Sequence, residues 1–526
     1  MVSMIFAVLT TLLLLWAGVS MFIWFLRYDL RMFQQHSYRP ERFWRWWGGS
    51  GNWFSAFLDW MLRIPAKLPL VVTARVKRLM ATDILLTLLL FCAGVWGLLR
   101  LSGASSTGVL PWNGWALPLA VCLTLSCLLA ASKCLLLLAN AVNQPMEKAI
   151  SRWYYNDARK RLKAHKDLIV IGVTGSYGKT STKNYLYRIL SEQYNVLVTP
   201  GNFNTTLGVV RTVREQLQPW HQVFIVEMGA KQPGDIREIC ELVHPSIGIV
   251  ASVGPMHLET FGSLENIQKT KFELVRALPA DGFAAINADS PGIASYRDVP
   301  THCCVVRYGV RNGDFRALNV AYSTEGSSFD LGGVTMKTTL LGESNIQNIL
   351  AACAVATRLG VSPERQKCAI AKLQQVEHRL FVSRRGAYTV IDDAYNSNPE
   401  GAAMALDVLR DFRGGRKFLI TPGFVELGTA QAEECRKLGY KAAFCADVLM
   451  IVNKVNRDAI LSGAREAMAE ASSRTDGASS PKETVRLTEE NIHCPDDLSV
   501  VFPLLDKLVR PGDVVLYEND LPDTFI

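Results

Sequence analysis

The 526-residue chain lacks the cysteine spacing of a disulfide framework or a zinc site. Its twelve cysteines include no Cys-x-x-Cys pair and no histidine at zinc-ligand spacing. We therefore expect reduced, mostly buried thiols of a cytosolic domain. Glycine and proline are not enriched, and a net charge of +8 is small for this length. These features exclude a disordered chain and give no indication of a nucleic-acid partner.

Charge is almost absent from three long stretches of the first 142 residues. Residues 4–26, 82–99 and 115–141 are apolar and long enough to cross a bilayer as helices. No Lys or Arg precedes the first stretch, which argues against a signal peptide. The second carries only Asp83 and the third only Lys133. We expect a multi-pass membrane region with three transmembrane helices.

The loops between these stretches differ in charge, and this difference predicts the orientation. Residues 101–114 carry no charge, whereas the first loop is rich in basic residues. These are Arg27, Arg31, Arg39, Arg42, Arg45, Arg63, Lys67, Arg75, Lys77 and Arg78. The positive-inside rule then puts the N-terminus outside the cell membrane and everything after residue 141 in the cytoplasm.

The same loop is rich in tryptophan. Its tryptophans are Trp44, Trp46, Trp47, Trp53 and Trp60. Tryptophan interleaved with arginine favours a segment that lies on anionic lipid, and an ordinary cytoplasmic loop is the alternative.

The most informative motif follows an apolar, β-branched run at residues 168–173, which predicts a buried parallel strand. A glycine loop comes next, and residues 183–190 have a helical pattern. The loop residues are Thr174, Gly175, Ser176, Tyr177, Gly178, Lys179, Thr180 and Ser181. In this arrangement backbone N–H groups hold phosphates, the lysine contacts the β and γ oxygens, and the next hydroxyl binds Mg²⁺. Val173 stands where the general motif has glycine, but the context still predicts binding of ATP or a close relative.

Apolar runs alternate with helical patterns along the rest of the chain, which predicts α/β domains built on parallel sheets. The predicted strands are 196–198, 223–226, 247–250, 284–287, 389–391, 417–421, 448–452 and 514–517. A break near residues 376–385 divides this part into domains at 168–376 and 377–526. Residues 143–167 are polar and helix-prone, and they predict a connecting helix.

Several further motifs occur in a fixed order after the phosphate loop. They are Pro200-Gly-Asn-Phe-Asn204, Glu227-Met-Gly229, Gly254-Pro-Met-His257, Lys269-Thr-Lys271, Asn345-Ile-Gln-Asn348, His378-Arg379, Asp392-Asp393-Ala-Tyr-Asn-Ser-Asn398-Pro399 and Glu426-Leu-Gly428. Together they resemble the Mur ligases, and within that family the branch that adds D-alanyl-D-alanine to a UDP-muramoyl tripeptide. The resemblance implies a P-loop central domain, a Rossmann-like C-terminal domain and ATP-dependent amide-bond formation in cell-wall synthesis. A carboxylate would attack the γ-phosphate of ATP to give an acyl phosphate, and an amine would then displace phosphate.

The resemblance also implies roles for individual residues. Lys179 would neutralise phosphate charge, Thr180 and Glu227 would bind Mg²⁺, His257 would bind a second metal ion, and Lys271 would be carbamylated. Further positions correspond to ATP contacts at Asn348 (adenine), Arg379 (γ-phosphate) and Asp393 (ribose), and to substrate contacts at Asn202, Asn204, Tyr395, Asn396 and Asn398. The alternatives are a surface carboxylate for Glu227, a structural histidine for His257 and a solvated helix face for Lys269 and Lys271.

The chain also departs from the family pattern. The membrane region stands in place of the family's UDP-sugar-binding domain. Ser252 and Ser344 replace an expected Asn and His. Near the C-terminus Glu518, Asp520 and Asp523 replace a basic element, which would suit a cationic or amine-rich acceptor.

The acceptor is therefore left open between a UDP-linked muramoyl peptide and a lipid-linked or polymeric envelope precursor, joined to an amino acid or short peptide. A polyglutamate-type ligase and an inactive ATP-binding membrane scaffold are the alternative functions. The intact set Lys179, Thr180, Glu227, His257 and Lys271 favours a working ligase.

Overall fold

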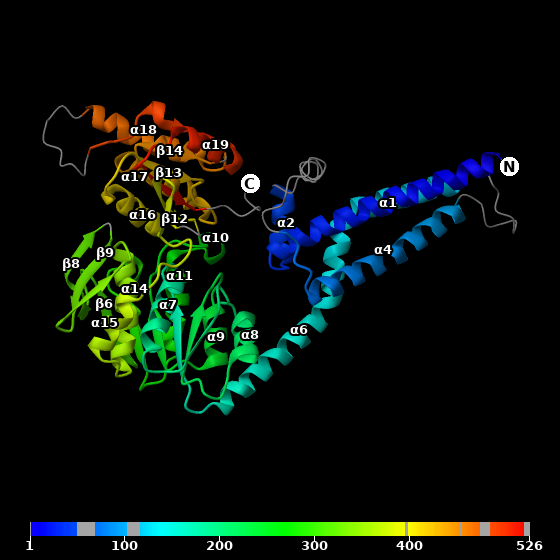
Figure 1. Cartoon of the computed structure of the whole chain (residues 1–526). Helices are drawn as coiled ribbons and strands as arrows, with labels where there is room; N and C mark the ends of the chain where they lie inside the picture. Colours follow the sequence, from blue (N-terminus) through cyan, green and yellow to red (C-terminus); the bar gives the residue numbers. More distant parts are fainter. Residues whose placement is uncertain are drawn as a thin grey trace. The chain divides into compact units, whose positions relative to one another are not determined.

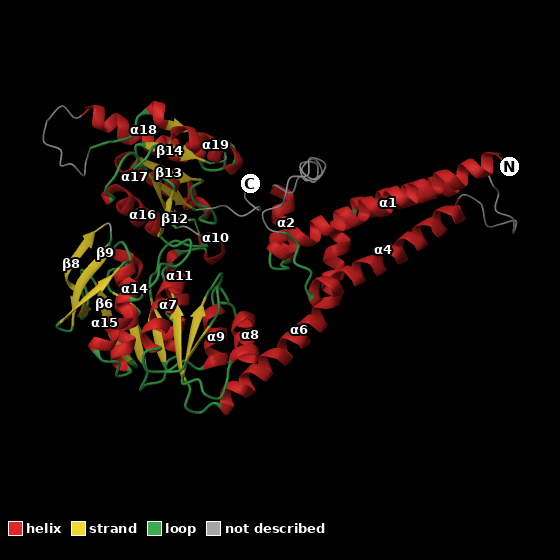
Figure 2. Cartoon of the chain, in the orientation of Figure 1, coloured by secondary structure: helices red, strands yellow, loops and turns green. Residues whose placement is uncertain are grey.

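The computed structural model describes residues 2–49, 69–101, 116–323, 325–394, 398–452, 454–473 and 484–519. The chain forms two compact units, one up to residue 153 and the other from residue 154 to residue 521 (Figure 1). The first contains helices, and the second combines helices and strands in an α/β fold (Figure 2).

The described helices of the first unit are α1 (Val2–Gln35), α2 (Pro40–Gly49), α4 (Ala74–Leu101), α5 (Ala116–Ala130) and the larger part of α6 (Ser132–Ala164), whose last residues belong to the second unit. Among the described residues, two helices are long and apolar enough to cross a membrane, at 5–35 and 74–100. The third predicted span, at 115–141, is not one straight helix. It comprises α5 and the start of α6, which meet at a bend of 66°. The predicted connecting helix is the continuation of α6.

The bend between α5 and α6 lies where the apolar sequence is interrupted by polar residues. Lys133 Nζ lies 3.5 Å from Asp29 Oδ1 of α1, and both side chains are almost fully buried. Ser132 donates a hydrogen bond to the same carboxylate (3.4 Å). A charged side chain in an apolar bundle needs a partner, and these contacts provide one at the bend.

Helix α2 packs against the end of α1 through its aromatic side chains. Phe43 and Trp46 are buried with Leu30 and Phe33. Trp44, on the other face, is about half exposed and available to an interfacial environment. Trp53, Trp60, Arg63 and Lys67 lie outside the described residues.

All twelve cysteines are described and all are free thiols. The expectation that most are buried is wrong, because seven have exposed side chains. Four of these, Cys92, Cys122, Cys127 and Cys134, lie on the apolar helices of the first unit. An apolar side chain on the outside of such a helix needs no protein core around it.

A seven-stranded sheet forms the centre of the second unit. Its strands are β1 (Ile169–Thr174), β2 (Val196–Val198), β3 (Val223–Met228), β4 (Ile247–Val250), β5 (Phe283–Asn287), β6 (Cys304–Gly309) and β7 (Phe315–Arg316). The order among the described residues is β2-β3-β1-β4-β5-β6-β7, and all pairs are parallel. Because β1 pairs with β3 on one side and β4 on the other, its carboxyl end opens into the switch-point crevice where ligands of such sheets bind.

Helices cover both faces of this sheet, and successive side chains of β1 point to opposite faces. Ile171 and Val173 pack with α7 (Lys179–Leu190), α14 (Glu343–Arg358) and α15 (Pro363–Ala371). The opposite face packs against a second set of helices. These are α8 (Thr206–Gln216), α9 (Asp235–Val243), α11 (Leu264–Lys271) and α12 (Glu273–Arg276).

Smaller elements complete the central domain: α10 (Leu258–Phe261), α13 (Pro291–Ala294), and the antiparallel strands β8 (Leu318–Ser323), β9 (Gly326–Leu331) and β10 (Val334–Thr338).

The C-terminal domain has its own sheet. Its strands are β11 (Phe381–Arg385), β12 (Tyr388–Asp393), β13 (Lys417–Thr421), β14 (Val448–Ile451), β15 (Ile492–His493) and β16 (Val514–Glu518). Their order is β11-β12-β16-β13-β14-β15, with only the β11–β12 pair antiparallel among the described strands. The helices are α16 (Pro399–Asp411), α17 (Gln431–Cys445), α18 (Arg457–Ser473) and α19 (Leu498–Leu508). Each strand predicted from the sequence is present in one of the two sheets.

Glycines set the close packing of α17 against α18, which yields a stability prediction. A Cβ at Gly463 would lie 1.8 Å from the carbonyl oxygen of Arg436. We expect Gly463→Ala to lower the free energy of unfolding of the C-terminal domain by about 1–3 kcal/mol, because the two backbones must separate. Thermal denaturation of the detergent-solubilised protein measures this change. Ser462→Ala, exposed on the same turn, is the control, and equal melting temperatures for the two variants would contradict the packing argument.

Candidate active site

The phosphate loop joins the carboxyl end of β1 to the first turn of α7. Thr174 donates its hydroxyl hydrogen bond to the carbonyl of Met228 (3.0 Å), which ties the end of β1 to β3. Gly178 has a φ of 78° and precedes α7. A Cβ there would lie 2.6 Å from Asn348 Oδ1, so both the backbone conformation and the close approach of α14 require glycine.

Ser252 supports this loop from the end of β4. Its hydroxyl donates to the carbonyl of Tyr177 (2.8 Å) and accepts from the N–H of the same residue (2.9 Å). Ser176 adds a further link by donating to the carbonyl of Gly254 (3.0 Å). From the sequence Ser252 was only a departure from the family pattern. Its role as a support for the loop depends on β4 lying beside β1, which no local sequence signal reveals.

Lys179 is folded back onto the loop that it follows. Its ammonium donates to the carbonyls of Gly175 (2.7 Å) and Ser176 (2.9 Å). Burial lowers the pKa of Lys179 to about 8; Glu227 opposes this shift and Arg379 adds to it. A bound phosphate would favour the charged form, so the loop is arranged to receive an anion.

Thr180 and Glu227, the expected Mg²⁺ ligands, are in direct contact. The Thr180 hydroxyl donates to Glu227 Oε1 (3.2 Å), and Asn204 donates to the same oxygen (3.1 Å). Lys183 Nζ lies 3.0 Å from Glu227 Oε2, and both side chains are about 2% exposed. Burial pushes the pKa of Glu227 upward, but Lys183 and Lys179 outweigh it, and the pKa lies below its ordinary value. Glu227 is therefore an ionised carboxylate held in place.

This donor set fits Mg²⁺ of the kind that binds together with phosphates. In the described ranges no three His, Cys, Asp or Glu side chains group closely enough to hold a metal ion by themselves. Mg²⁺ in nucleotide sites usually takes one or two protein oxygens and completes its shell with phosphates and water. Thr180 and Glu227 supply those two oxygens.

Lys271 is buried at the end of α11, with 3% of its surface exposed. Across the described part of the chain, its Nζ makes no hydrogen bond or ion pair. Burial holds the pKa of Lys271 well below its ordinary value, and Lys179 lowers it further. Lys269, in contrast, is an exposed lysine paired with Glu265 (2.6 Å). A neutral, buried amine is the form that can add CO₂, so Lys271 has the environment expected of a carbamylated lysine.

His257 lies before α10 and meets a residue of the C-terminal domain. Its Nδ1 contacts the carboxylate of Glu426, in the segment after β13. The sequence marks Glu426 only as part of the Glu-Leu-Gly motif, because its contact with His257 joins positions 169 residues apart.

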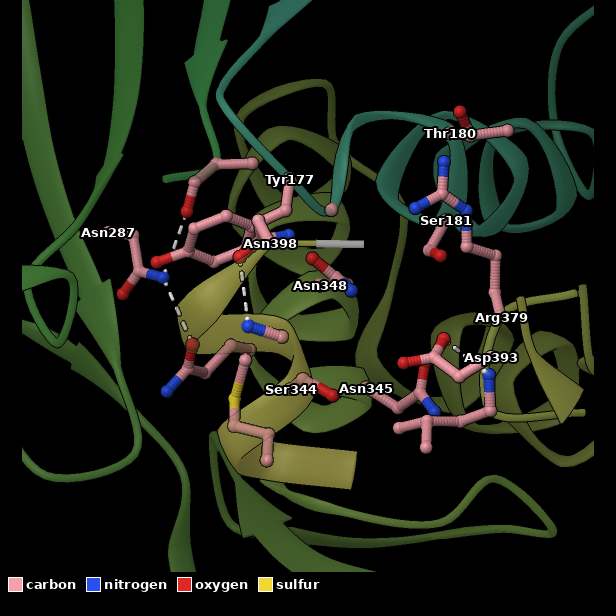
Figure 3. Close-up of a pocket in the computed structure, with 16 residues that line it drawn as sticks. Tyr177, Thr180, Ser181, Asn287, Ser344, Asn345, Asn348, Arg379, Asp393 and Asn398 are labelled. Atoms are coloured by element: carbon pink, nitrogen blue, oxygen red, sulfur yellow. Dashed lines mark hydrogen bonds between the residues drawn. The ribbon is translucent and has the colours of Figure 1, made fainter. Parts of the chain in front are cut away.

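A pocket extends from the phosphate loop to the C-terminal domain (Figure 3). The residues that line it include Tyr177, Gly178, Thr180, Ser181, Asn287, Ser344, Asn345, Asn348, Arg379, Asp393 and Asn398. Figure 3 shows the Arg379 guanidinium pointing toward the first turn of α7. Tyr177 Oη is buried and has no hydrogen-bond partner among the residues described. A hydroxyl without such a partner, in a pocket beside the phosphate loop, is available to hydrogen-bond with a bound nucleotide.

Asp393 and Asn398 take part in the local structure of this pocket. Asp393 Oδ1 accepts from the N–H of Leu380 (3.0 Å), and burial raises the pKa of Asp393 to about 6, with Arg379 opposing that shift. Asn398 caps α16 by accepting from the N–H of Gly401 (2.9 Å). Tyr395 and Asn396, also expected to bind substrate, lie outside the described residues.

A second groove adjoins the pocket, since Thr180 and Arg379 line both. The other charged residues that line it are Lys183, Arg188, Lys372, Glu377 and His378. Asn202, which was expected to bind substrate, lines it too. Basic groups outnumber the single acid in this lining, and three of them pair with carboxylates: Lys183 with Glu227, Arg188 with Glu192 and His378 with Asp392. The remaining excess of positive charge suits an anionic substrate. Asn204 does not line this groove; it holds Glu227 instead.

The acidic acceptor pocket expected near the C-terminus is not supported at Glu518. This carboxyl is fully buried and accepts a hydrogen bond from Thr421 (2.7 Å). Burial raises the pKa of Glu518 to about 8, so the group is largely neutral at pH 7. Asp520 and Asp523 lie outside the described residues.

Glu400, in the first turn of α16, gives a prediction of pH dependence. Burial raises its pKa from 4.5 to about 7. In the unfolded chain the carboxyl ionises near pH 4.5, so stability falls as the pH rises from there to about 7. We expect Glu400→Gln to melt at a higher temperature than the unmodified protein at pH 8, but not at pH 4. Glu364→Gln is the matched control, because Glu364 likewise follows a proline at a helix start but is exposed. The same pH profile for both variants would contradict the assignment.

Comparisons with known proteins agree with this architecture. Residues 173–356 match the Mur ligase middle domain, and residues 378–517 match the Mur ligase glutamate ligase domain. The UDP-N-acetylmuramoyl-tripeptide–D-alanyl-D-alanine ligase of Mycobacterium bovis is 34% identical over 66% of this chain and 70% of its own length. The enzyme of the same name from Escherichia coli is 34% identical, over 53% of this chain and 63% of its own length, which is less than two thirds.

Solved structures give the same result. The crystal structure of MurF from Acinetobacter baumannii covers 71% of this chain and 78% of its own, with 26% identity and a TM-score of 0.62. MurF ligase from Thermotoga maritima in complex with ADP covers 70% and 80%, with 26% identity and a TM-score of 0.59. The matched domains, the phosphate loop and the shared α/β architecture lead to one conclusion: the chain belongs to the Mur ligase family.

Proposed function

We propose that this protein is a membrane-anchored, ATP-dependent ligase that forms an amide bond in the synthesis of a cell-envelope precursor. The observation that carries the proposal is the pocket at the phosphate loop. Thr180 of the central domain lines it together with Arg379 and Asp393 of the C-terminal domain, and Lys179 lies near enough to Arg379 for the two charges to influence each other. Basic and polar groups that two domains place beside a phosphate loop are what an ATP-dependent condensation requires.

The proposed reaction has two steps. A carboxylate oxygen of the acceptor attacks the γ-phosphorus of ATP. The bond from that phosphorus to the oxygen of the β-phosphate breaks, ADP leaves, and the acceptor becomes an acyl phosphate. The amine of the second substrate then attacks the acyl carbon, phosphate leaves, and the amine loses a proton. Lys179 and Arg379 offset the negative charge that accumulates when a carboxylate approaches a triphosphate. Mg²⁺ held by Thr180 and Glu227 would supply further charge neutralisation.

His257 and Lys271 would serve a second metal ion. His257 supplies an imidazole, and a carbamate on Lys271 would supply oxygens from a buried position. The low pKa of Lys271 supports this role, because CO₂ reacts with the neutral amine.

The substrates follow from the groove beside the pocket and from the relatives. The basic groove suits an anionic acceptor, either a UDP-linked muramoyl peptide or a lipid-linked envelope precursor. D-Alanyl-D-alanine, named in the relatives, is the first candidate for the amine. The apolar helices support anchoring in the cell membrane, and the basic first loop supports an outside N-terminus with cytoplasmic catalytic domains.

Substrate-dependent phosphate release tests the proposal. The detergent-solubilised protein is given Mg-ATP with UDP-muramoyl peptides or lipid-linked precursors, each with D-alanyl-D-alanine or single amino acids. We expect release only when both an acceptor and an amine are present, and a loss of more than about 100-fold in Lys179→Ala, because loop charge stabilises the transition state.

The control is Lys269→Ala, which removes an exposed lysine outside the pocket and should leave the rate unchanged. ATP binding without phosphate release for every substrate pair would reject the ligase in favour of an ATP-binding scaffold.

Carbamylation of Lys271 is tested separately by ¹³C NMR. Protein equilibrated with ¹³C-bicarbonate should give a carbamate carbon signal near neutral pH, because burial lowers the pKa of the Lys271 amine and so increases its neutral fraction. Lys271→Arg should lack the signal and Lys269→Arg should keep it. An identical spectrum for the unmodified protein and Lys271→Arg would show that this lysine is not the modified one.

A further inference from the structure

The contact between His257 and Glu426 is formed by two backbone segments in an uncommon conformation. His257 has a φ of 52° and Glu426 a φ of 63°, both in the left-handed region that residues with a side chain rarely adopt. The N–H of Glu259 also donates to the carbonyl of Glu426 (3.3 Å). Strained positions persist where surrounding contacts hold them, and they concentrate at functional sites.

The atoms in contact have a chemical consequence. Nδ1 of His257 faces the Glu426 carboxylate, so the proton of a neutral imidazole resides on Nδ1 and is donated to Glu426. The lone pair then lies on Nε2. Metal-binding histidines are commonly fixed in this way, with one ring nitrogen donating to a carboxylate and the other facing the metal. The His257 side chain is only 16% exposed, so its ring has little freedom to adopt another arrangement.

We propose that Glu426 is a positioning residue for the metal site of His257. It fixes the ring and its tautomer, leaving Nε2 free for a divalent cation. Because Glu426 belongs to the C-terminal domain, docking of that domain and metal binding at His257 favour each other. The inference rests on the proposed function, since that proposal assigns His257 to a metal ion.

Metal binding, measured without turnover, tests this role. The full-length protein in detergent is titrated with Mn²⁺ in the presence of a non-hydrolysable ATP analogue, and bound Mn²⁺ is followed by electron paramagnetic resonance. We expect Glu426→Ala to weaken the Mn²⁺ site that His257→Ala removes by about 10–100-fold, as loss of an orienting carboxylate does elsewhere. Glu426→Gln should lose less, because its amide oxygen still accepts from Nδ1–H. Glu265→Gln, an exposed carboxylate in the first turn of α11, is the matched control and should bind like the unmodified protein.

Hydrogen exchange of residues 423–428 provides a second readout. Coupling between two events is reciprocal, so Mn²⁺ with nucleotide should slow exchange there in the unmodified protein and not in His257→Ala.

The outcomes separate the inference from the function beneath it. If His257→Ala loses one Mn²⁺ site while Glu426→Ala binds normally, the positioning role is overturned and the proposed metal ligand stands. If Glu426→Gln binds as poorly as Glu426→Ala, the carboxylate is a direct ligand and the positioning role is again overturned. If His257→Ala itself binds Mn²⁺ normally, the metal assignment in the proposed function fails.

Discussion

Buried charge at the carboxyl edge of the central sheet is the constraint on which the site depends. Glu227 is paired with Lys183, and the amines of Lys179 and Lys271 lie close enough to influence each other. Asp235 and Glu273 also attract the Lys271 amine, but burial outweighs them, and lysine charge without a close carboxylate is costly at this buried edge. The protein accommodates it by lowering the pKa values of Lys179 and Lys271. Phosphates would restore the balance, which is why the arrangement favours binding of a polyanion.

Two sheets contribute to the same pocket, each through the ends of its strands. The central sheet presents the phosphate loop at β1 and Glu227 at the end of β3. The C-terminal domain presents Asp393 at the end of β12 and Arg379 just before β11. Neither domain alone holds the complete set of charged groups. A site divided in this way is completed only when the two domains are docked, which suits the proposed reaction, whose acyl phosphate must be kept from water.

The helical first unit poses a different physical problem, which is the burial of charge among apolar helices. Asp29 and Lys133 resolve it by pairing with each other where α6 begins. The bend between α5 and α6 lies at the same place, so the polar pair and the change of helix direction occur together. The third span was predicted from the length and hydropathy of residues 115–141. Length and hydropathy do not show where a helix changes direction beside a polar contact.

The sequence by itself determined the elements and the chemistry of the phosphate loop. Runs of β-branched residues marked the strands, and Gly178 with Lys179 and Thr180 marked the anion site, because these signals are local. The tertiary structure decided which residues support that site. Ser252 beneath the loop, Lys183 against Glu227, the neutral state of Glu518 and the contact of Glu426 with His257 all depend on strand order and burial. Such contacts join residues far apart in the chain, and the pKa of a buried group is set by neighbours that only folding brings to it.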